Sequence, residues 1–183
     1  CLGPGLMLRR ENTRLRGLCI DALGGLGPFV HRRAVALGEF RDGMSNTVFW
    51  SERVLGSYST GQVDPWRDEW EFRSMPDCDT DGLVQFCRSP NAPATSIGIW
   101  HGATWMVGGW KSTWYNHAET PNPQHADCTR AVQGVSAPAG TYSARSYHAG
   151  GVNVAFGDGA AKFVSEQVDL RVWRAWSTRG SDD

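Results

Sequence analysis

Long apolar runs are missing from this chain of 183 residues. No stretch approaches the roughly 18 apolar residues that a membrane-spanning helix needs, and no secretory signal is present. Positive and negative charges nearly balance at a formal net charge of −1, which gives no argument for binding nucleic acid or an anionic membrane. The sequence begins with Cys1 and no Met, so we expect a processed or truncated chain.

Catalytic signatures are missing as well. There is no G-x-S-x-G nucleophile elbow, no H-E-x-x-H zinc motif and no Walker loop. The sequence therefore predicts a protein that is not an enzyme.

The five cysteines include no C-x-x-C pair, which argues against a zinc ribbon or a thioredoxin-type site. Cys78 and Cys87 flank a loop containing Asp and Gly, and a disulfide between them would close a small ring. Cys19 with Cys128 is a looser pairing, and Cys1 would be left over. Free buried cysteines are the alternative to disulfides.

The clearest structural signal is a hairpin near the C-terminus. Val152, Val154 and Phe156 alternate with less apolar residues, which is typical of a strand with one buried face. The following Gly157–Gly159 segment contains Asp-Gly, which favours a primed two-residue turn, and residues 162–164 form the return strand.

Three sequence blocks resemble one known family. His148 is followed, after nine residues, by Asp158-Gly159. A second block contains Asp42, Gly43, Ser45, Asn46, Thr47 and Glu52, and a third runs from Tyr115-Asn116-His117 to Cys128. This pattern is similar to the pilin-like proteins abundant in planctomycete bacteria, called domain of unknown function 1559 or solute-binding protein family 10.

The resemblance implies a fold and a compartment rather than a reaction. Members typically have a prepilin-like leader, a long apolar helix and an extracytoplasmic α+β domain, and their biochemical activity is not established. We therefore expect residues 1–26 to be an N-terminal segment of a truncated region, with the shaft helix largely absent. Residues 27–183 would form the pilin-like, extracytoplasmic α+β domain.

The predicted fold is an antiparallel sheet with long loops and a short C-terminal helix. Residues 58–93 are the least regular region, because prolines interrupt them. The predicted strands and the predicted helix span, in chain order, residues 47–54, 104–107, 152–157, 160–165 and 169–178.

Two family positions invite a chemical interpretation. Glu52 lies within an apolar run and, if buried, needs a partner such as Arg145. His148 and Asp158 lie at opposite ends of one strand, roughly 15–20 Å apart at ~3.3 Å per residue, which argues against a catalytic pair. Asp158 is therefore predicted to be a turn residue.

Metal ligands are suggested at two places. Asp77, Asp79 and Asp81 precede Gly82, as in the opening of a calcium loop, but Arg88 stands where such a loop has Glu. An acidic loop is the alternative to bound calcium. His117 and His125 are a weaker metal pair, since loop histidines more often form hydrogen bonds.

The chain is rich in tryptophan, with nine residues. Trp100, Trp105 and Trp110 recur every five residues, which fits neither a helix face nor a strand face. Exposed tryptophans stack on sugar rings, whereas core packing is their commoner role. Two functions remain: a pilin-like or pseudopilin-like surface or filament subunit that self-assembles or binds protein partners, and a glycan- or solute-binding module that uses these tryptophans.

Overall fold

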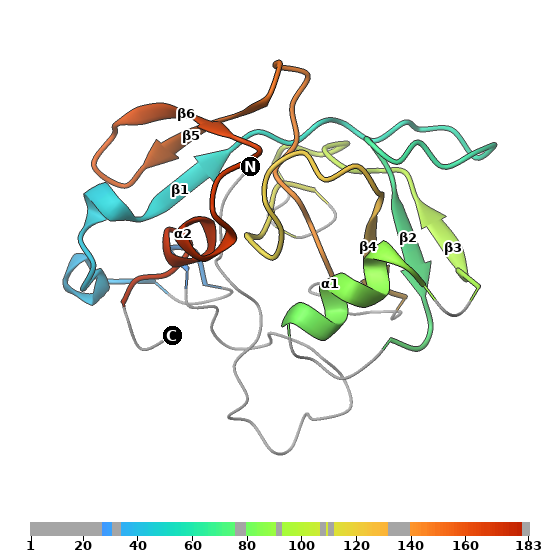
Figure 1. The fold of residues 1–183 in the computed structure, drawn as a ribbon, viewed down its shortest axis with the longest axis horizontal. Coiled ribbons are helices and arrows are strands. Elements are labelled where there is room, and N and C mark those ends of the chain that lie inside the picture. The colour runs from blue at the N-terminus through green and yellow to red at the C-terminus, as the bar shows by residue number, and fades with distance from the viewer. Residues whose placement is uncertain are drawn as a thin grey trace.

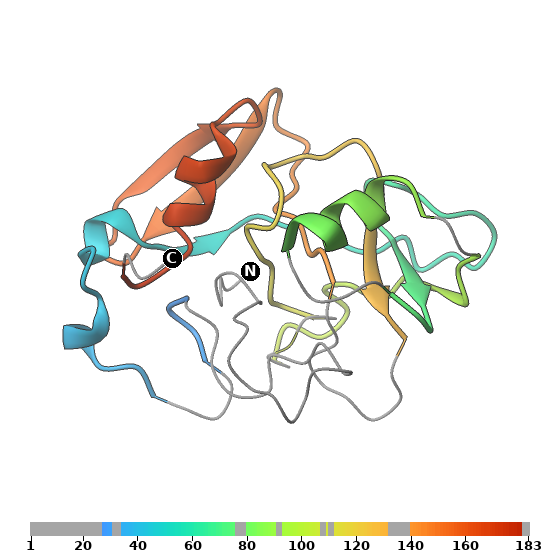
Figure 2. The ribbon, with the colours of Figure 1, turned by 60° about the horizontal axis from the view of Figure 1, so that its bottom comes forward.

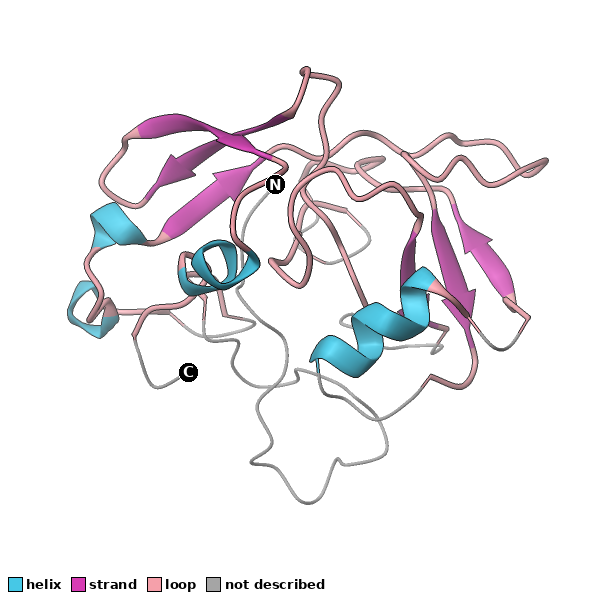
Figure 3. Ribbon diagram, viewed as in Figure 1, coloured by secondary structure: helices cyan, strands magenta, loops and turns pink. Residues whose placement is uncertain are grey.

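Two small three-stranded sheets lie at opposite ends of the molecule, and most of the chain between them is loop (Figures 1 and 3). This arrangement comes from a computed structural model that describes residues 27–30, 34–75, 80–90, 93–106, 109, 112–131 and 140–180. The predicted α+β class with long loops is confirmed. The expected N-terminal segment, residues 1–26, lies outside the described residues.

The first sheet contains β1 (Val48–Ser51), β5 (Gly151–Phe156) and β6 (Ala161–Ser165). The strand order is β1-β5-β6, and both pairings are antiparallel. Val152, Val154 and Phe156 are all buried, as their alternation predicts. The predicted hairpin is therefore confirmed.

The turn of this hairpin differs from the predicted one. Phe156 N donates to Ala160 O and Gly159 N donates to Phe156 O, so three residues rather than two form the loop. Within the loop only Gly159 has a positive φ, of 90°. A type I turn followed by a left-handed glycine suits this loop length, so a primed turn is not required.

Helix α2 (Leu170–Ala175) covers the first sheet. Asp169 caps it, because its side chain accepts hydrogen bonds from the backbone N–H groups of Arg171 and Val172. The helix is shorter than the predicted 169–178, and its Trp173 is fully buried. Trp173 packs in one core with residues of all three strands.

The second sheet includes one strand, β2 (Glu69–Phe72), from residues 58–93, the region predicted to be irregular. Its other strands are β3 (Ser96–Gly98) and β4 (Asp127–Arg130), in the order β3-β2-β4. Strand β2 pairs antiparallel with β3 and parallel with β4. The predicted strand at 104–107 is wrong for residues 104–106, because Thr104 lies in no regular element and Trp105 and Met106 lie in a turn; Val107 lies outside the described residues.

Helix α1 (Thr80–Arg88) packs beside this second sheet, as Figure 2 also shows. Its buried Leu83 and Phe86 join Phe72 of β2 in a second apolar core. Cys87 of α1 forms a disulfide with Cys128 of β4, across a sequence separation of 41 residues. The predicted Cys78–Cys87 pairing is therefore wrong, as is Cys19–Cys128, because the helix places Cys87 over β4.

A buried ion cluster connects the two halves. Asp127, at the start of β4, accepts from Arg53 Nη2 at 3.2 Å and from Arg145 Nη2 at 3.3 Å. Arg53 follows β1 and Arg145 precedes β5. Burial raises the pKa of Asp127, but the charges of Arg145 and Arg53 and two hydrogen bonds from Ser143 outweigh it and hold the pKa below its usual range. Arg145 thus pairs with Asp127 rather than with Glu52, for which the sequence suggests it as a partner only if Glu52 is buried.

Candidate binding site

Strand β2 places a carboxylate at the centre of the second sheet. Glu69 pairs with Gly98 of β3 on one side and with Asp127 of β4 on the other, so its backbone is held from both sides. Its side chain is fully buried. A Cβ at Gly98 would lie 2.5 Å from Glu69 Cγ and 2.5 Å from Oε1, so only glycine leaves room for this side chain.

His101 faces this carboxylate from the turn after β3. His101 Nε2 lies 3.2 Å from Glu69 Oε2, and the imidazole is 2 % exposed. The two groups are within ion-pair distance but lack hydrogen-bond geometry. Within the described part of the chain, neither oxygen of Glu69 and neither ring nitrogen of His101 has a hydrogen-bond partner. Such buried groups are rare in folded proteins.

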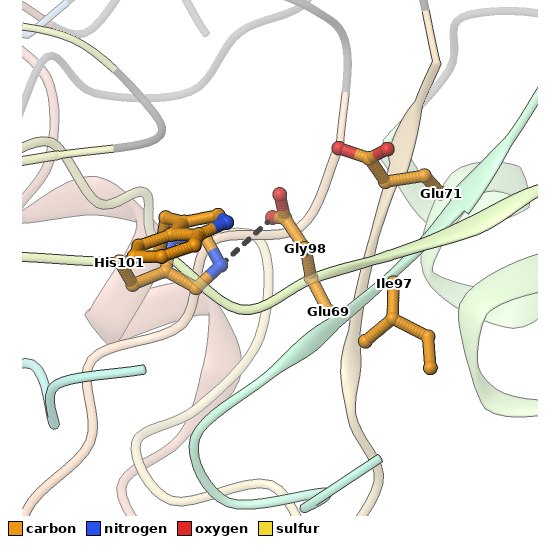
Figure 4. A pocket seen from close by; sticks show the side chains of 6 residues that line it. Glu69, Glu71, Ile97, Gly98 and His101 are labelled. Carbon is orange, nitrogen blue, oxygen red and sulfur yellow. Dashed lines mark ion pairs between the residues drawn. The ribbon is translucent and has the colours of Figure 1, made fainter. Parts of the chain in front are cut away.

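These two side chains border a pocket with a volume of about 240 Å³ (Figure 4). Its lining consists of Glu69, Glu71, Ile97, Gly98, Trp100 and His101. In Figure 4 the Glu69 carboxylate points toward His101, and Glu71 lies farther along the same strand. Glu71 already accepts a short hydrogen bond from Ser96 Oγ. The pocket thus combines two carboxylates, one imidazole and one indole.

An exposed apolar surface adjoins the pocket. Trp100 is 63 % exposed, and the ring of Tyr58 lies edge-on to it at a centroid distance of 5.5 Å. Leu55 is exposed beside the backbone of Gly102, and Trp105 and Met106 follow in the next turn. We call these five residues (Leu55, Tyr58, Trp100, Trp105 and Met106) the aromatic surface.

The predicted tryptophan site is therefore divided. Trp100 lines the pocket, whereas Trp105 is 82 % exposed and does not. Trp110 lies outside the described residues. Core packing, the alternative considered for these tryptophans, does not apply to Trp100 or Trp105.

The family block around Asp42 and Gly43 forms a turn against the C-terminal segment. Gly43 has φ 85° and ψ 147°, a conformation that only glycine adopts readily. Asn46 Nδ2 donates to Asp42 O, and Thr47 Oγ1 donates to Gly43 O. The backbone of Arg41 and Asp42 donates to Arg179 O. Ser45 lies in the short 3-10 helix of this turn.

Two further family positions contact each other. His148 Nε2 lies 3.0 Å from Glu52 Oε1, and Glu52 also accepts from the backbone and side chain of Asn153. Burial raises the pKa of Glu52, but the Asn153 and His148 hydrogen bonds outweigh it and lower the pKa. Asp158 accepts from Ala160 N and Gly159 follows it, so Asp158 is a turn residue, as predicted.

His117 and His125, the weaker candidate metal pair, lie in different environments. His117 is fully buried and bonds with Trp173 O and Tyr115 Oη. His125 bonds instead with Glu119, which also holds Arg88. These contacts give both rings hydrogen-bonding roles, the alternative considered from the sequence.

Only one of the three predicted calcium ligands, Asp81, lies among the described residues. Asp77 and Asp79 lie outside the described residues, while Asp81 lies in the first turn of α1 and pairs with Arg174 at 2.8 Å. Among the described residues, no group of three His, Cys, Asp or Glu side chains could hold a metal ion. Because two of its ligands are not described, bound calcium stays a prediction.

Sequence reasoning missed the two central residues of this site. Glu69 belongs to an acidic stretch, where a carboxylate is normally solvated, and His101 stands alone between Trp100 and Gly102. The alternation of Glu69, Trp70, Glu71 and Phe72 is the single strand signal there. It is too short to indicate which carboxylate is buried.

Comparison with known proteins identifies a family but gives no function. No curated protein matches the chain, and no solved structure does. No helix within the described ranges is long and apolar enough to cross a membrane. One family, described as "Protein of unknown function (DUF1559)", matches residues 11–171. Because this match covers most of the sequence, the chain belongs to the DUF1559 family, the one that its sequence blocks resemble.

Proposed function

We propose that this chain is an extracytoplasmic, pilin-like surface or filament subunit that acts by protein–protein contact, including contact with further copies of itself. The observation that carries the proposal is the aromatic surface. Trp105 is 82 % exposed and Met106 is 74 % exposed, and Trp100 and Tyr58, whose rings contact each other, are also exposed. Clustered exposed aromatic side chains are typical of interaction sites, and aromatic residues and Met are enriched in interfaces.

The compartment is supported by the disulfide. Cys87 and Cys128 are bonded between two elements of the second sheet region. Structural disulfides persist mainly in oxidising compartments, such as the periplasm and the cell surface. This agrees with the extracytoplasmic domain that the pilin-like resemblance implies.

Sedimentation velocity from about 1 µM to about 1 mM protein tests self-association. The wild-type chain is expected to form larger species as concentration rises. Trp105→Ala should shift the association to at least about tenfold higher concentration, because exposed tryptophans dominate interface energetics. Val172→Ala, which removes an exposed apolar group from α2, is the matched control and should associate like the wild type. A monomer at every concentration would refute self-assembly.

The second candidate, a glycan- or solute-binding module, is favoured by a separate observation. The pocket beside Trp100 contains buried polar atoms without hydrogen-bond partners in the described chain. Because Trp105 does not line the pocket, Trp105→Ala tests assembly and leaves the pocket intact. Glu69→Gln changes the pocket and leaves the aromatic surface intact, so the two functions are separable.

A further inference from the structure

The pocket between β2 and the turn after β3 offers hydrogen-bonding atoms that the described part of the protein does not use. Both carboxylate oxygens of Glu69 and both ring nitrogens of His101 lack a hydrogen-bond partner there, although Glu69 Oε2 and His101 Nε2 lie within ion-pair distance and both side chains are at least nine-tenths buried. An ionised carboxylate can only accept hydrogen bonds, whereas an imidazole donates or accepts. An occupant that completes this site must therefore supply donors to Glu69 and a hydroxyl-like group to His101.

The carboxylate is fixed in place rather than adaptable. Strand β2 is the central strand, and the Glu69 side chain lies against Gly98, where a Cβ would come within 2.5 Å. One of its oxygens, Oε2, already lies within ion-pair distance of His101 Nε2, at 3.2 Å. Glu71, the second carboxylate, already accepts a hydrogen bond from Ser96. Neither carboxylate therefore requires a cationic occupant.

The volume of the pocket and its lining side chains further restrict the class of ligand that it can bind. Its volume of about 240 Å³ lies below the roughly 300–1,000 Å³ of sites for drug-sized ligands, so it suits one small ring. Trp100 lines the pocket and keeps 63 % of its surface exposed, and Tyr58 supports its ring edge-on. An exposed indole is a flat apolar surface on which the C–H face of a ring can stack.

We propose that this pocket binds a single sugar ring, with its apolar face on Trp100 and its hydroxyl groups donating to Glu69 and bonding with His101. The proposal rests on the solute-binding candidate above and names its ligand class. A hydroxyl both donates and accepts, which matches the mixture of carboxylate and imidazole.

Saturation-transfer NMR and tryptophan fluorescence with a panel of methyl glycosides, used up to ~100 mM, test the proposal. At least one glycoside is expected to give a saturable signal and to shift the His101 ring resonances. Trp100→Ala and Glu69→Gln should each weaken that binding by at least about tenfold, through lost stacking and a lost charged acceptor. Trp105→Ala and Glu166→Gln are the matched controls and should bind like the wild type.

The outcomes distinguish this proposal from the assembly function. If no glycoside binds, the sugar site is refuted, even where the wild type still associates. Binding of methylammonium but of no glycoside would equally overturn the assignment. Unchanged affinity in Trp100→Ala would place any sugar elsewhere, and this variant keeps the test valid if Glu69→Gln does not fold, because Trp100 is mostly exposed.

Discussion

The buried imidazole of His117 makes the stability of the protein sensitive to acid. Its ring stacks on Trp173 at a centroid distance of 3.8 Å and an interplanar angle of 12°. Nδ1 lies 2.6 Å from Trp173 O and Nε2 lies 3.0 Å from Tyr115 Oη. A carbonyl can only accept, so Nδ1 carries the proton and Nε2 accepts from the tyrosine. Burial lowers the pKa of His117 to about 3, which keeps the ring neutral in the folded state.

The magnitude follows from proton linkage. In the unfolded chain His117 takes up a proton near its ordinary pKa of 6.5, while the folded chain does so near 3. Between these values the unfolded state binds more protons, so the free energy of unfolding rises with pH and falls on acidification. From pH 7 to pH 5 the contribution of His117 alone is a loss of about 2 kcal/mol.

His125 acts in the opposite direction and provides the matched comparison. Its hydrogen bond with Glu119 raises the pKa of His125. The stability it contributes is full below the unfolded pKa and is lost as pH rises through the folded pKa. Replacing His125 by Gln should therefore steepen the loss of stability on acidification, whereas His117→Gln should flatten it.

Urea denaturation at pH 7, 6 and 5 measures these slopes, with a difference of about 2 kcal/mol expected between wild type and His117→Gln over that range. Imidazole NMR of the wild type gives a readout that needs no variant, since the His117 ring should stay neutral at pH 5. A His117 ring that titrates near 6.5 in the folded protein would refute the reasoning.

Three further predictions concern the scaffold. Replacing both Cys87 and Cys128 by Ser should lower the free energy of unfolding by about 4 kcal/mol in denaturation experiments, because the disulfide closes a loop with a separation of 41 residues. Peptide mapping that finds either cysteine bonded elsewhere would contradict the pairing. Asp127→Asn leaves two buried guanidinium groups without their carboxylate and should cost about 3–5 kcal/mol; a cost close to that of Glu166→Gln would argue against the cluster. Gly43→Ala should cost about 1–3 kcal/mol because φ is 85° there, whereas Gly38→Ala, with open space around it, should be tolerated, and equal melting temperatures would disprove strain at Gly43.

The first sheet could be predicted because its signals are local. The alternation through Val152, Val154 and Phe156 and the Gly-rich turn lie within one short segment, and each specifies its own structure. The details of the turn could not be predicted, because Asp-Gly fits both a two-residue and a three-residue loop.

The second sheet could not be predicted, for physical reasons. Its strands have three or four residues, and β2 contains two glutamates, so neither length nor alternation separates them from loop. Parallel pairing of β2 with β4 joins residues more than fifty positions apart. The pairs Cys87–Cys128, Arg145–Asp127 and Glu69–His101 depend on that long-range arrangement, which no local pattern encodes.

The separation of the two sheets also explains why the family blocks around Asp42 and His148 give no information about a ligand. Asp42, Glu52, His148 and Asp158 all lie in or next to the first sheet, where they form turns and bond with its strands. The pocket lies in the second sheet, around Glu69 and His101. These two blocks therefore specify a scaffold, since their hydrogen bonds are already used within it, whereas the third block ends at Cys128 in β4 of the second sheet. In our proposal, binding chemistry belongs to the second sheet, where Glu69 and His101 lack hydrogen-bond partners in the described chain.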